Sequence, residues 1–586
     1  MPYAEGGPRR LADAVTGPSR PERDRSRCSC YADGLGYAEG GRRRILLYAE
    51  GMSTPRGSLG RCPGPDVRRR PRHLAVGHMD WLTIYTAAFF AITFMFLTTI
   101  ISKIIARIRT VLPSRKENRS PSRPTQVVSG APLLVALLTL VTPKKGLHAA
   151  IHYLHMKMGS VFTVNLLGLK KVTFLVGPEV TPHFFRASPS EIDFGVTAKI
   201  IVPVLGPGVL FGVDLATRNE QIRFCIKAIK PARLQRDVHS MVRELECYFS
   251  KWEQHGIVDL KHELGQLIVV IANRFLLGNE IKDKNLGEVS TLLHEIFENS
   301  FHMINFFFPH LPIQSHRRRD EARARLGEIL GDIVRSRRRI ISARVRDDHD
   351  EDGDVLQSFI DSKYSDGRSM TESEIVGLLI GILFAGQHTS MSTSTWTGAC
   401  LLTHEKYLAA AVEEQRQIIA QNGEHMDYTI LSKMGTLHCC IREALRLYSP
   451  TPMLVRQSHK SFTVKTREGI DYEIPKGHTL ACSVALSNKL PYIYKNPDVY
   501  DPCRFGPGRA EDKAGGKFSD LSFGAGRYSC LGKDYAFMQI KVIWSFLLRN
   551  FELKLISPFP EQEHEKILPG PRGRVMVTYT RRSLVT

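Results

Sequence analysis

The chain has 586 residues, of which 43% are hydrophobic and 9% aromatic, enough to bury a large core in one large domain or several smaller ones. Its net charge is +21, but residues 1–78 hold 15 Arg, no Lys and 8 acidic residues. The rest of the positive charge lies along helical patterns and beside an apolar segment, so we expect contact with a membrane and not with nucleic acid. The eleven cysteines are scattered, which argues against a disulfide framework and favours reduced thiols on the cytosolic side.

The first 78 residues have a composition that cannot build a packed core. They are rich in Arg, Gly and Pro, and they repeat the unit Tyr-Ala-Glu-Gly at Tyr3, Tyr37 and Tyr48. Low-complexity segments of this kind bury too little apolar surface to offset the entropy of ordering the chain. Two interpretations of residues 1–78 are open: a disordered basic tail, or an upstream region with translation starting at Met79.

An apolar segment follows, and we predict a transmembrane anchor helix over residues 79–109. No charged residue occurs in Trp81–Ser102, which is long enough to span the ~30 Å hydrocarbon layer as a helix. Lys103 and Arg107 follow it, whereas a secretory signal ends in small residues, so the main domain is expected on the cytosolic side. The prolines and basic residues of 110–132 predict a stiff linker.

Residues 133–586 are predicted to form one domain of a mainly α (α+β) class. Strand patterns occur at Val161–Asn165, at Val172–Val176 and, near the end, at Arg574–Tyr579, with many amphipathic helices between them. Strands and helices do not alternate in series, which argues against a doubly wound sheet. The basic stretch Arg317–Arg339 is interpreted as a solvated helix face.

The first motif with chemical meaning is Ala385-Gly386-Gln387-His388-Thr389-Ser390, inside the apolar run Ile375–Trp396. Gly386 weakens a helix where a ligand can need room, and Thr389 places a hydroxyl beside it. A single histidine in an apolar helix is more often a structural residue than a catalyst. The motif alone therefore leaves both interpretations open.

A second motif pairs opposite charges. Glu443 and Arg446 lie three residues apart in a helical pattern and face the same side. Such a pair is common on helix surfaces. Another arginine, Arg504, occurs in Asp501–Phe505, shortly before the third motif.

The third motif is a glycine-rich loop around a cysteine. Phe523, Gly526, Cys530 and Gly532 have the spacing F-x-x-G-x-x-x-C-x-G, and Arg527 follows the first of these glycines. An apolar run with helical spacing comes next, so the helix dipole and backbone N–H groups would stabilise a thiolate at its start. The glycines let the backbone approach a flat cofactor, and the arginine can meet an anionic group on it. The alternative is a structural cysteine in a glycine-rich loop.

Together these motifs resemble the heme–thiolate enzymes of the cytochrome P-450 superfamily. The six-residue motif at Ala385 is similar to the signature of the sterol 14α-demethylases, especially plant and protist members, and the resemblance covers about residues 125–583. It implies a cytochrome P-450 fold, with a helix-rich heme domain and small β-sheets. Further matching segments are Leu311–Asp320, Asp361–Tyr364, Met453–Gln457 and Pro491–Pro497.

The resemblance implies roles for particular residues. Cys530 is the expected axial ligand of the iron of heme b, and His388 and Thr389 are expected to handle protons during catalysis. The other expected cofactor-binding residues are Arg527, Arg456, Phe523, Gly524, Gly532 and Gly386. Glu443, Arg446 and Arg504 are expected to form a buried structural ion network. The expected substrate-pocket residues are Ile200, Phe211, Ala385, Met453 and Leu454.

The implied reaction removes the 14α-methyl group of a sterol precursor by three successive oxidations that end in formate and a Δ14 double bond. Each step uses O2 and two electrons from NADPH. The chain has no flavin or nicotinamide fingerprint, so a separate reductase is the expected partner. The implied location is the endoplasmic reticulum membrane, with a single pass.

The chain departs from the family near the expected heme propionates and in the substrate pocket. Ala198 and Phe211 stand where relatives carry tyrosines. Asn219, next to Arg218, stands where relatives carry an arginine, and Tyr528 where they carry a basic residue. Ile200 stands where plant-like members carry a phenylalanine. These departures keep two alternatives open. One is a heme–thiolate isomerase or lyase that needs no reductase, against which Thr389 argues. The other is a non-catalytic membrane protein that binds sterol or heme.

Overall fold

The computed structural model describes residues 122–141, 146–166, 170–278, 280, 283–301, 305, 312–343, 353–564 and 566–584. By its contacts the chain divides into residues 1–88 and 89–586, and all described residues belong to the second unit. The predicted N-terminal segment, the predicted anchor and most of the predicted linker lie outside the described residues.

Three sheets are present in the described part of the chain. The largest has six strands in the order β2-β3-β4-β10-β7-β5, and two smaller ones have the orders β1-β9-β8 and β11-β12-β6. The strands are β1 Arg123–Pro124, β2 Gln126–Val127, β3 Val161–Leu166, β4 Lys170–Leu175, β5 Ile192–Asp193, β6 His255–Asp259, β7 Met453–Ser458, β8 Phe462–Lys465, β9 Asp471–Ile474, β10 Thr479–Ser483, β11 Phe551–Leu555 and β12 Met576–Arg581.

Helices make up most of the rest. The α-helices are α2 Ala131–Val141, α3 Gly146–Met158, α4 Pro182–Arg186, α5 Gly195–Leu205, α6 Leu215–Ala228, α7 Pro231–Ser250, α8 Leu260–Leu277, α9 Asp283–Ser300, α11 Gln314–Ala343, α12 Val355–Ile360, α13 Glu372–Thr403, α14 Glu405–Asn422, α15 Tyr428–Lys433, α16 Gly435–Leu447, α17 Val484–Ser487 and α18 Lys533–Asn550. The 3-10 turns are η3 Leu210–Gly212, η4 Pro502–Phe505, η5 Glu511–Lys513, η6 Gly516–Phe518 and η7 Gly526–Tyr528.

The helix-dominated α+β class is confirmed, and the predicted strands correspond to β3, β4 and β12 with shifts of up to two residues at their ends. Strands also occur inside the segment expected to be a linker. β1 pairs with β9, and β2 pairs with β3, so backbone hydrogen bonds join residues 123–127 to the sheets. Two-residue strands carry too little pattern to be recognised in a sequence.

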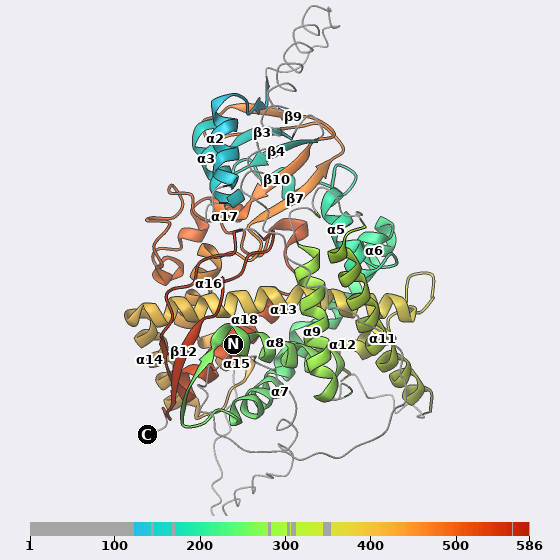
Figure 1. Ribbon diagram of the computed structural model, residues 1–586, viewed down its shortest axis with the longest axis vertical. Helices are drawn as coiled ribbons and strands as arrows, with labels where there is room; N and C mark the ends of the chain where they lie inside the picture. The colour runs from blue at the N-terminus through green and yellow to red at the C-terminus, as the bar shows by residue number, and fades with distance from the viewer. Residues whose placement is uncertain are drawn as a thin grey trace, which may run out of the picture. The chain divides into compact units, whose positions relative to one another are not determined.

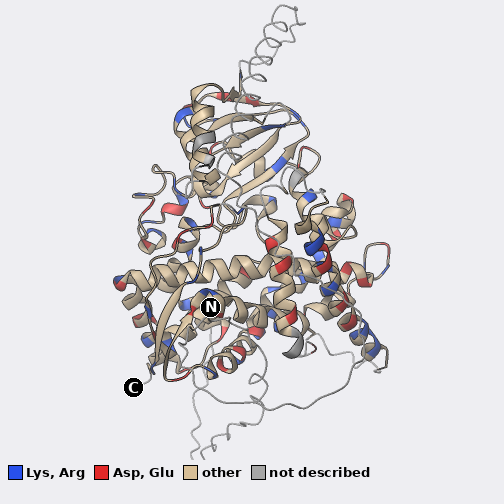
Figure 2. Cartoon of the chain, viewed as in Figure 1, with Lys and Arg blue, Asp and Glu red and all other residues tan. Residues whose placement is uncertain are grey.

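α13 is the longest helix and runs through the core (Figure 1). A capping box begins it: the Thr371 hydroxyl accepts from the Glu374 backbone N–H, and the Glu374 carboxylate accepts from the Thr371 N–H. Among the described helices it alone is long and apolar enough to cross a membrane, but 61% of its most apolar window is buried. That burial is typical of a core helix, and Figure 2 shows the helix almost free of charged side chains beyond its first turn.

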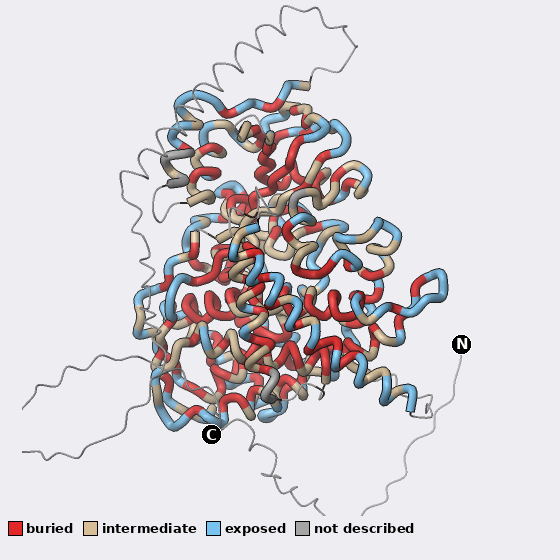
Figure 3. The backbone as a smooth tube through the Cα atoms, turned by 45° about the vertical axis from the view of Figure 1, so that its right-hand side comes forward, coloured by how far each residue is buried: buried red, intermediate tan, exposed pale blue. Residues whose placement is uncertain are grey.

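The main hydrophobic core surrounds α13 and includes side chains of α7, α8, α9, α11 and α18. Figure 3 shows the buried residues gathered in the interior of the described part of the chain, with exposed residues along its outline. The basic stretch expected as a solvated face forms α11, and most of its arginines are exposed. Arg319 is buried, however, and Arg323 donates to the carbonyls of Val204 and Leu205, because this end of the helix packs against α5.

Candidate functional site

A cavity of about 600 Å³ lies between α13, α5, α8, α9, β7 and the cysteine loop. Its size is in the range of small-molecule sites, and its walls are mostly apolar. Among the described lining residues Arg456 is the only Lys or Arg, and none is Asp or Glu. The predicted residues that line it are Phe211, Ala385, Gly386, His388, Thr389, Leu454, Arg456, Phe523, Gly524, Cys530 and Gly532.

The cysteine loop forms one wall. The Cys530 backbone N–H donates to the Phe523 carbonyl at 2.8 Å, which closes the loop just before α18 begins at Lys533. Gly526 has φ +62°, and a Cβ there would lie 2.7 Å from the Phe185 carbonyl oxygen, so this turn needs glycine. Cys530 is exposed where it lines the cavity, but the surrounding protein still displaces water from its thiol and so raises the pKa of that thiol, while the Gly532 backbone and Lys533 act in the opposite direction. Ligation to a metal would favour the thiolate form.

The α13 motif forms the wall on another side. A Cβ on Gly386 would meet nothing within 4 Å, so this glycine leaves open space. The Thr389 hydroxyl donates to the Ala385 carbonyl at 2.6 Å, which leaves its oxygen able to accept a hydrogen bond. Within two turns, α13 therefore presents to the cavity the small side chain of Ala385, the open space at Gly386 and the hydroxyl of Thr389.

His388 is 8% exposed and stacks on Phe297 of α9, with ring centroids 3.8 Å apart. Burial, together with the nearby charges of Lys566 and Lys261, lowers its pKa to about 3, so the imidazole is neutral at pH 7. Its Nε2 has no hydrogen-bond partner among the described residues. A neutral ring with an unpartnered nitrogen can pass a proton but does not hold a charge at rest.

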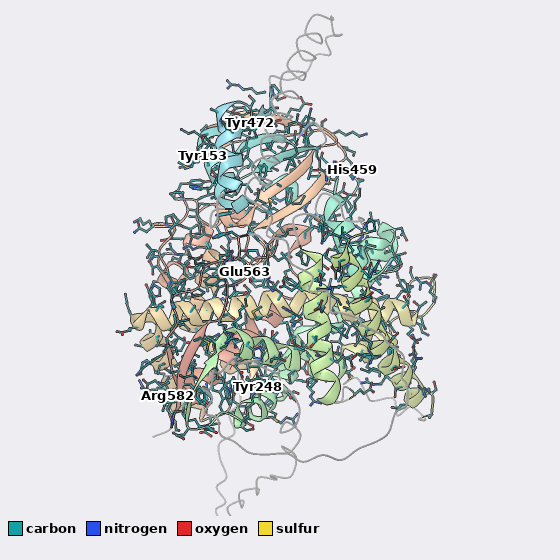
Figure 4. The ribbon with its side chains drawn as sticks, in the orientation of Figure 1. Tyr153, Tyr248, His459, Tyr472, Glu563 and Arg582 are labelled. Carbon is teal, nitrogen blue, oxygen red and sulfur yellow. The ribbon has the colours of Figure 1, made fainter. Side chains whose placement is uncertain are left out.

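A charged cluster that the sequence did not reveal lies behind His388. Lys566 pairs with Glu298 of α9 at 2.7 Å and with Glu563 at 3.5 Å, and Lys261 of α8 lies 3.6 Å from Glu563. A Cβ on Gly570 would lie 3.5 Å both from the Glu563 carboxylate and from His388 Cε1. The loop that carries Glu563 (labelled in Figure 4) thus packs against the α13 motif at His388.

Arg456 lies on β7 and is 4% exposed. Its Nε and Nη1 have no acceptor among the described residues, although burial lowers its pKa only to about 10 and it stays charged at pH 7. A buried, unpaired guanidinium is strongly unfavourable. Its Nε and Nη1 groups are therefore available to bind an anion at the cavity.

Three predicted residues, Ile200, Met453 and Arg527, do not line the cavity. In α5, Thr197, Ile201 and Leu205 face it, so Ile200 lies on another side of the helix and packs in the main core. In β7, Leu454 and Arg456 face it, so the alternation of a strand turns Met453 to the opposite face.

Arg527 is exposed and is also absent from the cavity wall, where its neighbour Tyr528 is present. Among the described residues Arg456 is the only arginine on this wall, and Arg218 instead donates to the backbone carbonyls of Leu210 and Val213. Ala198, another departure from the family pattern, does not line the cavity either.

The structure brings together the three residues expected to form the ion network. Glu443 Oε2 lies 2.7 Å from Arg446 Nε, Glu443 Oε1 lies 2.9 Å from Arg504 Nε, and all three side chains are at most 1% exposed. Glu511, which the sequence did not indicate, pairs with Arg504 at 2.5 Å. The network joins α16 to η4 and does not line the cavity.

The residues present fit the heme that the sequence resemblance implies. An apolar cavity suits a flat macrocycle, Cys530 supplies a sulfur ligand, and the unpartnered N–H groups of Arg456 suit an anionic propionate. No cluster of three or more His, Cys, Asp or Glu within the described ranges could hold a metal ion directly.

Comparisons with known proteins agree with this geometry. The family model described as "Cytochrome P450" matches residues 126–581. Obtusifoliol 14-alpha demethylase of Sorghum bicolor is 48% identical over 475 residues, which cover 81% of this chain and 94% of that protein. Sterol 14-demethylase of Arabidopsis thaliana is 48% identical over 487 residues, covering 83% and 96%.

More distant relatives agree as well. Lanosterol 14-alpha demethylase of Homo sapiens is 31% identical over 73% of this chain and 81% of its own. A solved structure, "Retinoic acid bound cyanobacterial CYP120A1", superposes with a TM-score of 0.65 at 21% identity, over 79% of this chain and all of that one, and supports the fold alone. The chain therefore belongs to the cytochrome P450 family and, within it, to the sterol 14-demethylases of plant type.

Proposed function

We propose that this protein is a heme-dependent monooxygenase that removes the 14α-methyl group of a sterol precursor. One observation carries the proposal: Cys530, the α13 motif and Arg456 line a single apolar cavity. The relatives with which the chain shares 48% identity are named for this reaction. The function thus rests on the site as well as on the family.

Each wall of the cavity has its own task. Cys530 ligates the heme iron, and Arg456 holds a propionate through its unpartnered N–H groups. When bound, the heme supplies oxygen activation, and thiolate ligation favours cleavage of the O–O bond. Thr389 and His388 pass protons from the protein side to the cavity. The apolar side chains of α5, α8 and α9 exclude water and hold the substrate.

A sterol fits the lining. Phe275, Phe297, Phe301 and Phe384 provide broad apolar surface, and few polar groups face the cavity. The relatives from Sorghum bicolor and Triticum aestivum are named for obtusifoliol, which makes it the first substrate to test.

The partners and the location are part of the proposal. Electrons come from NADPH through a separate reductase, because the chain has no nucleotide fingerprint of its own. Trp81–Ser102, which has no charged residue, anchors the protein in the endoplasmic reticulum membrane by a single pass with the catalytic domain in the cytosol.

The test combines a spectrum with a turnover assay. The reduced protein with carbon monoxide should show the Soret band of thiolate ligation. With NADPH and a reductase it should convert obtusifoliol to a Δ14 product with release of formate, and a lanosterol arm measures preference. Product formation without NADPH would favour an isomerase or lyase, and a thiolate spectrum with no turnover of any 14α-methyl sterol would favour a binding protein.

A further inference from the structure

We propose that Tyr528 is a positioning residue for Arg456, so that heme retention depends on one cation held by aromatic rings. The inference rests on the heme of the proposed function and does not depend on which sterol is the substrate. It concerns the box formed by Phe184, Phe194 and Tyr528 around the guanidinium, called here the aromatic box.

Arg456 contacts ring faces, and no described carboxylate lies within ion-pair distance of it, although Asp193 is near enough to favour its charge. Its Cζ lies 3.6 Å from the ring centroid of Tyr528, 4.8 Å from that of Phe194 and 4.9 Å from that of Phe184. All three are within the ~6 Å range of cation–π attraction, which is stronger at desolvated sites. Rings cover a guanidinium without using its in-plane N–H groups, which agrees with the unpartnered Nε and Nη1.

Tyr528 is itself held in place. Its ring meets that of Phe194 edge to face at 5.4 Å, and its hydroxyl donates to the Ile192 carbonyl at 3.4 Å. Its backbone N–H donates to the Ala525 carbonyl at 3.3 Å within η7, two residues before Cys530. Through Tyr528, the loop that carries the thiolate also fixes the cation that meets the propionate.

Three other cations near this end of the cavity do not line it. The guanidinium of Arg218 lies 6.0 Å from the Phe194 ring, but it donates to the backbone carbonyls of Leu210 and Val213. Arg527 and Lys199 are exposed. Since Arg456 is the only described Lys or Arg that lines the cavity, the position of its guanidinium determines how the anion is held. A residue that fixes this position acts on heme retention without touching the iron.

The experiment measures the rate at which heme leaves the full-length holoprotein for excess apomyoglobin, followed by Soret absorbance. Tyr528→Leu removes the nearest ring and should accelerate transfer about five- to thirty-fold, the size expected for a desolvated cation–π contact. Tyr528→Phe keeps the ring and should stay within about two-fold of wild type. Tyr492→Leu is the matched control, because Tyr492 makes the same kind of contact with Arg467, at 4.3 Å, on the surface.

A double variant separates positioning from a general structural effect. If Tyr528 acts through Arg456, Tyr528→Leu should add nothing to the rate of Arg456→Met. Phe194→Leu replaces Tyr528→Leu in both comparisons if the latter does not load heme. Equal rates for Tyr528→Leu and wild type, equal acceleration by Tyr528→Phe, or additive effects with Arg456→Met would each overturn the proposal. A wild type without the thiolate spectrum would instead overturn the heme site.

Discussion

His388 of α13 stacks on Phe297 of α9, with ring centroids 3.8 Å apart and an interplanar angle of 22°. The contact holds a neutral imidazole at the cavity wall, between the core helix and the helix whose last turn binds Lys566. Because the ring is buried without a charge, its protonation should act against the folded state.

Acidification should therefore destabilise the protein partly through His388. The unfolded chain takes up this proton near pH 6.5, whereas the folded pKa is lowered to about 3, so the loss grows as the pH falls through this window. Between pH 7 and pH 5 the free energy of unfolding should fall by about 2 kcal/mol through this group. His388→Gln should lose less stability over this step when thermal midpoints are compared. His148 and His438, whose pKa values burial lowers to about 4, are unchanged in the variant and contribute equally in both proteins. The same drop in thermal midpoint for both proteins would therefore contradict the role given to His388.

Cys530→Ser should abolish the thiolate-type carbon monoxide spectrum and all demethylation, because a serine hydroxyl is a poor substitute for a thiolate on iron. Some heme should still bind through the cavity and Arg456. Cys503→Ser, at an exposed thiol outside the cavity, is the control and should behave as wild type. An unchanged spectrum in Cys530→Ser would refute the ligand assignment.

Thr389→Ala should uncouple NADPH consumption from product formation and raise hydrogen peroxide. The hydroxyl lies at the cavity in the only α13 turn that also presents an open glycine position, and a positioned proton relay contributes about 10²–10⁴-fold. Thr403→Ala on the same helix serves as the control, since that hydroxyl also donates four residues back, to Ala399, but lies outside the cavity. Product per NADPH equal to wild type in Thr389→Ala would exclude the relay.

Glu443→Gln should destabilise the fold by about 3–5 kcal/mol, because it leaves two fully buried arginines without their shared carboxylate. The matched change Glu413→Gln breaks a pair whose two side chains are 52–54% exposed, and should shift stability by less than about 1 kcal/mol. Thermal unfolding of both variants checks the difference. Similar effects of the two changes would show that burial does not set the strength of the network.

Removing residues 1–109 should give a more soluble protein that keeps heme and binds sterol. The deletion leaves all described residues intact, and the cavity is lined from Phe194 onwards. Spectral titration with obtusifoliol measures binding. Loss of sterol binding in a truncated protein that still carries heme would show that the N-terminal region contributes to the pocket.

The sequence was most informative where chemistry depends on neighbours along the chain. The spacing around Cys530 and the segment Ala385–Thr389 are local patterns, and both lie at the cavity. Which of two neighbouring residues in a helix or strand faces the cavity was less predictable. Ile201 and not Ile200, and Leu454 and not Met453, face the cavity, because the rotation of a helix and the register of a strand follow from packing against distant segments.

The aromatic box could not be predicted for the same reason. Phe184, Phe194, Arg456 and Tyr528 come from four separate segments, and no spacing relates them. The sequence showed that Tyr528 replaces a basic residue of the relatives. It did not show that the Tyr528 ring would stack on Arg456. The cluster of Glu563, Lys566 and Glu298 similarly requires a loop near the C-terminus to meet α9.

The cavity walls come from residues as far apart as Phe194 and Leu568, and β12, at Met576–Arg581, pairs with β6, at His255–Asp259. During synthesis the ribosome must therefore release almost the entire chain before these walls can meet. Until then, Phe275 of α8 lacks its ring partner Tyr535 of α18, and such uncovered apolar surface is open to aggregation and to chaperones. The complete heme site, which includes Cys530 and Leu568, can therefore form only when translation is nearly complete.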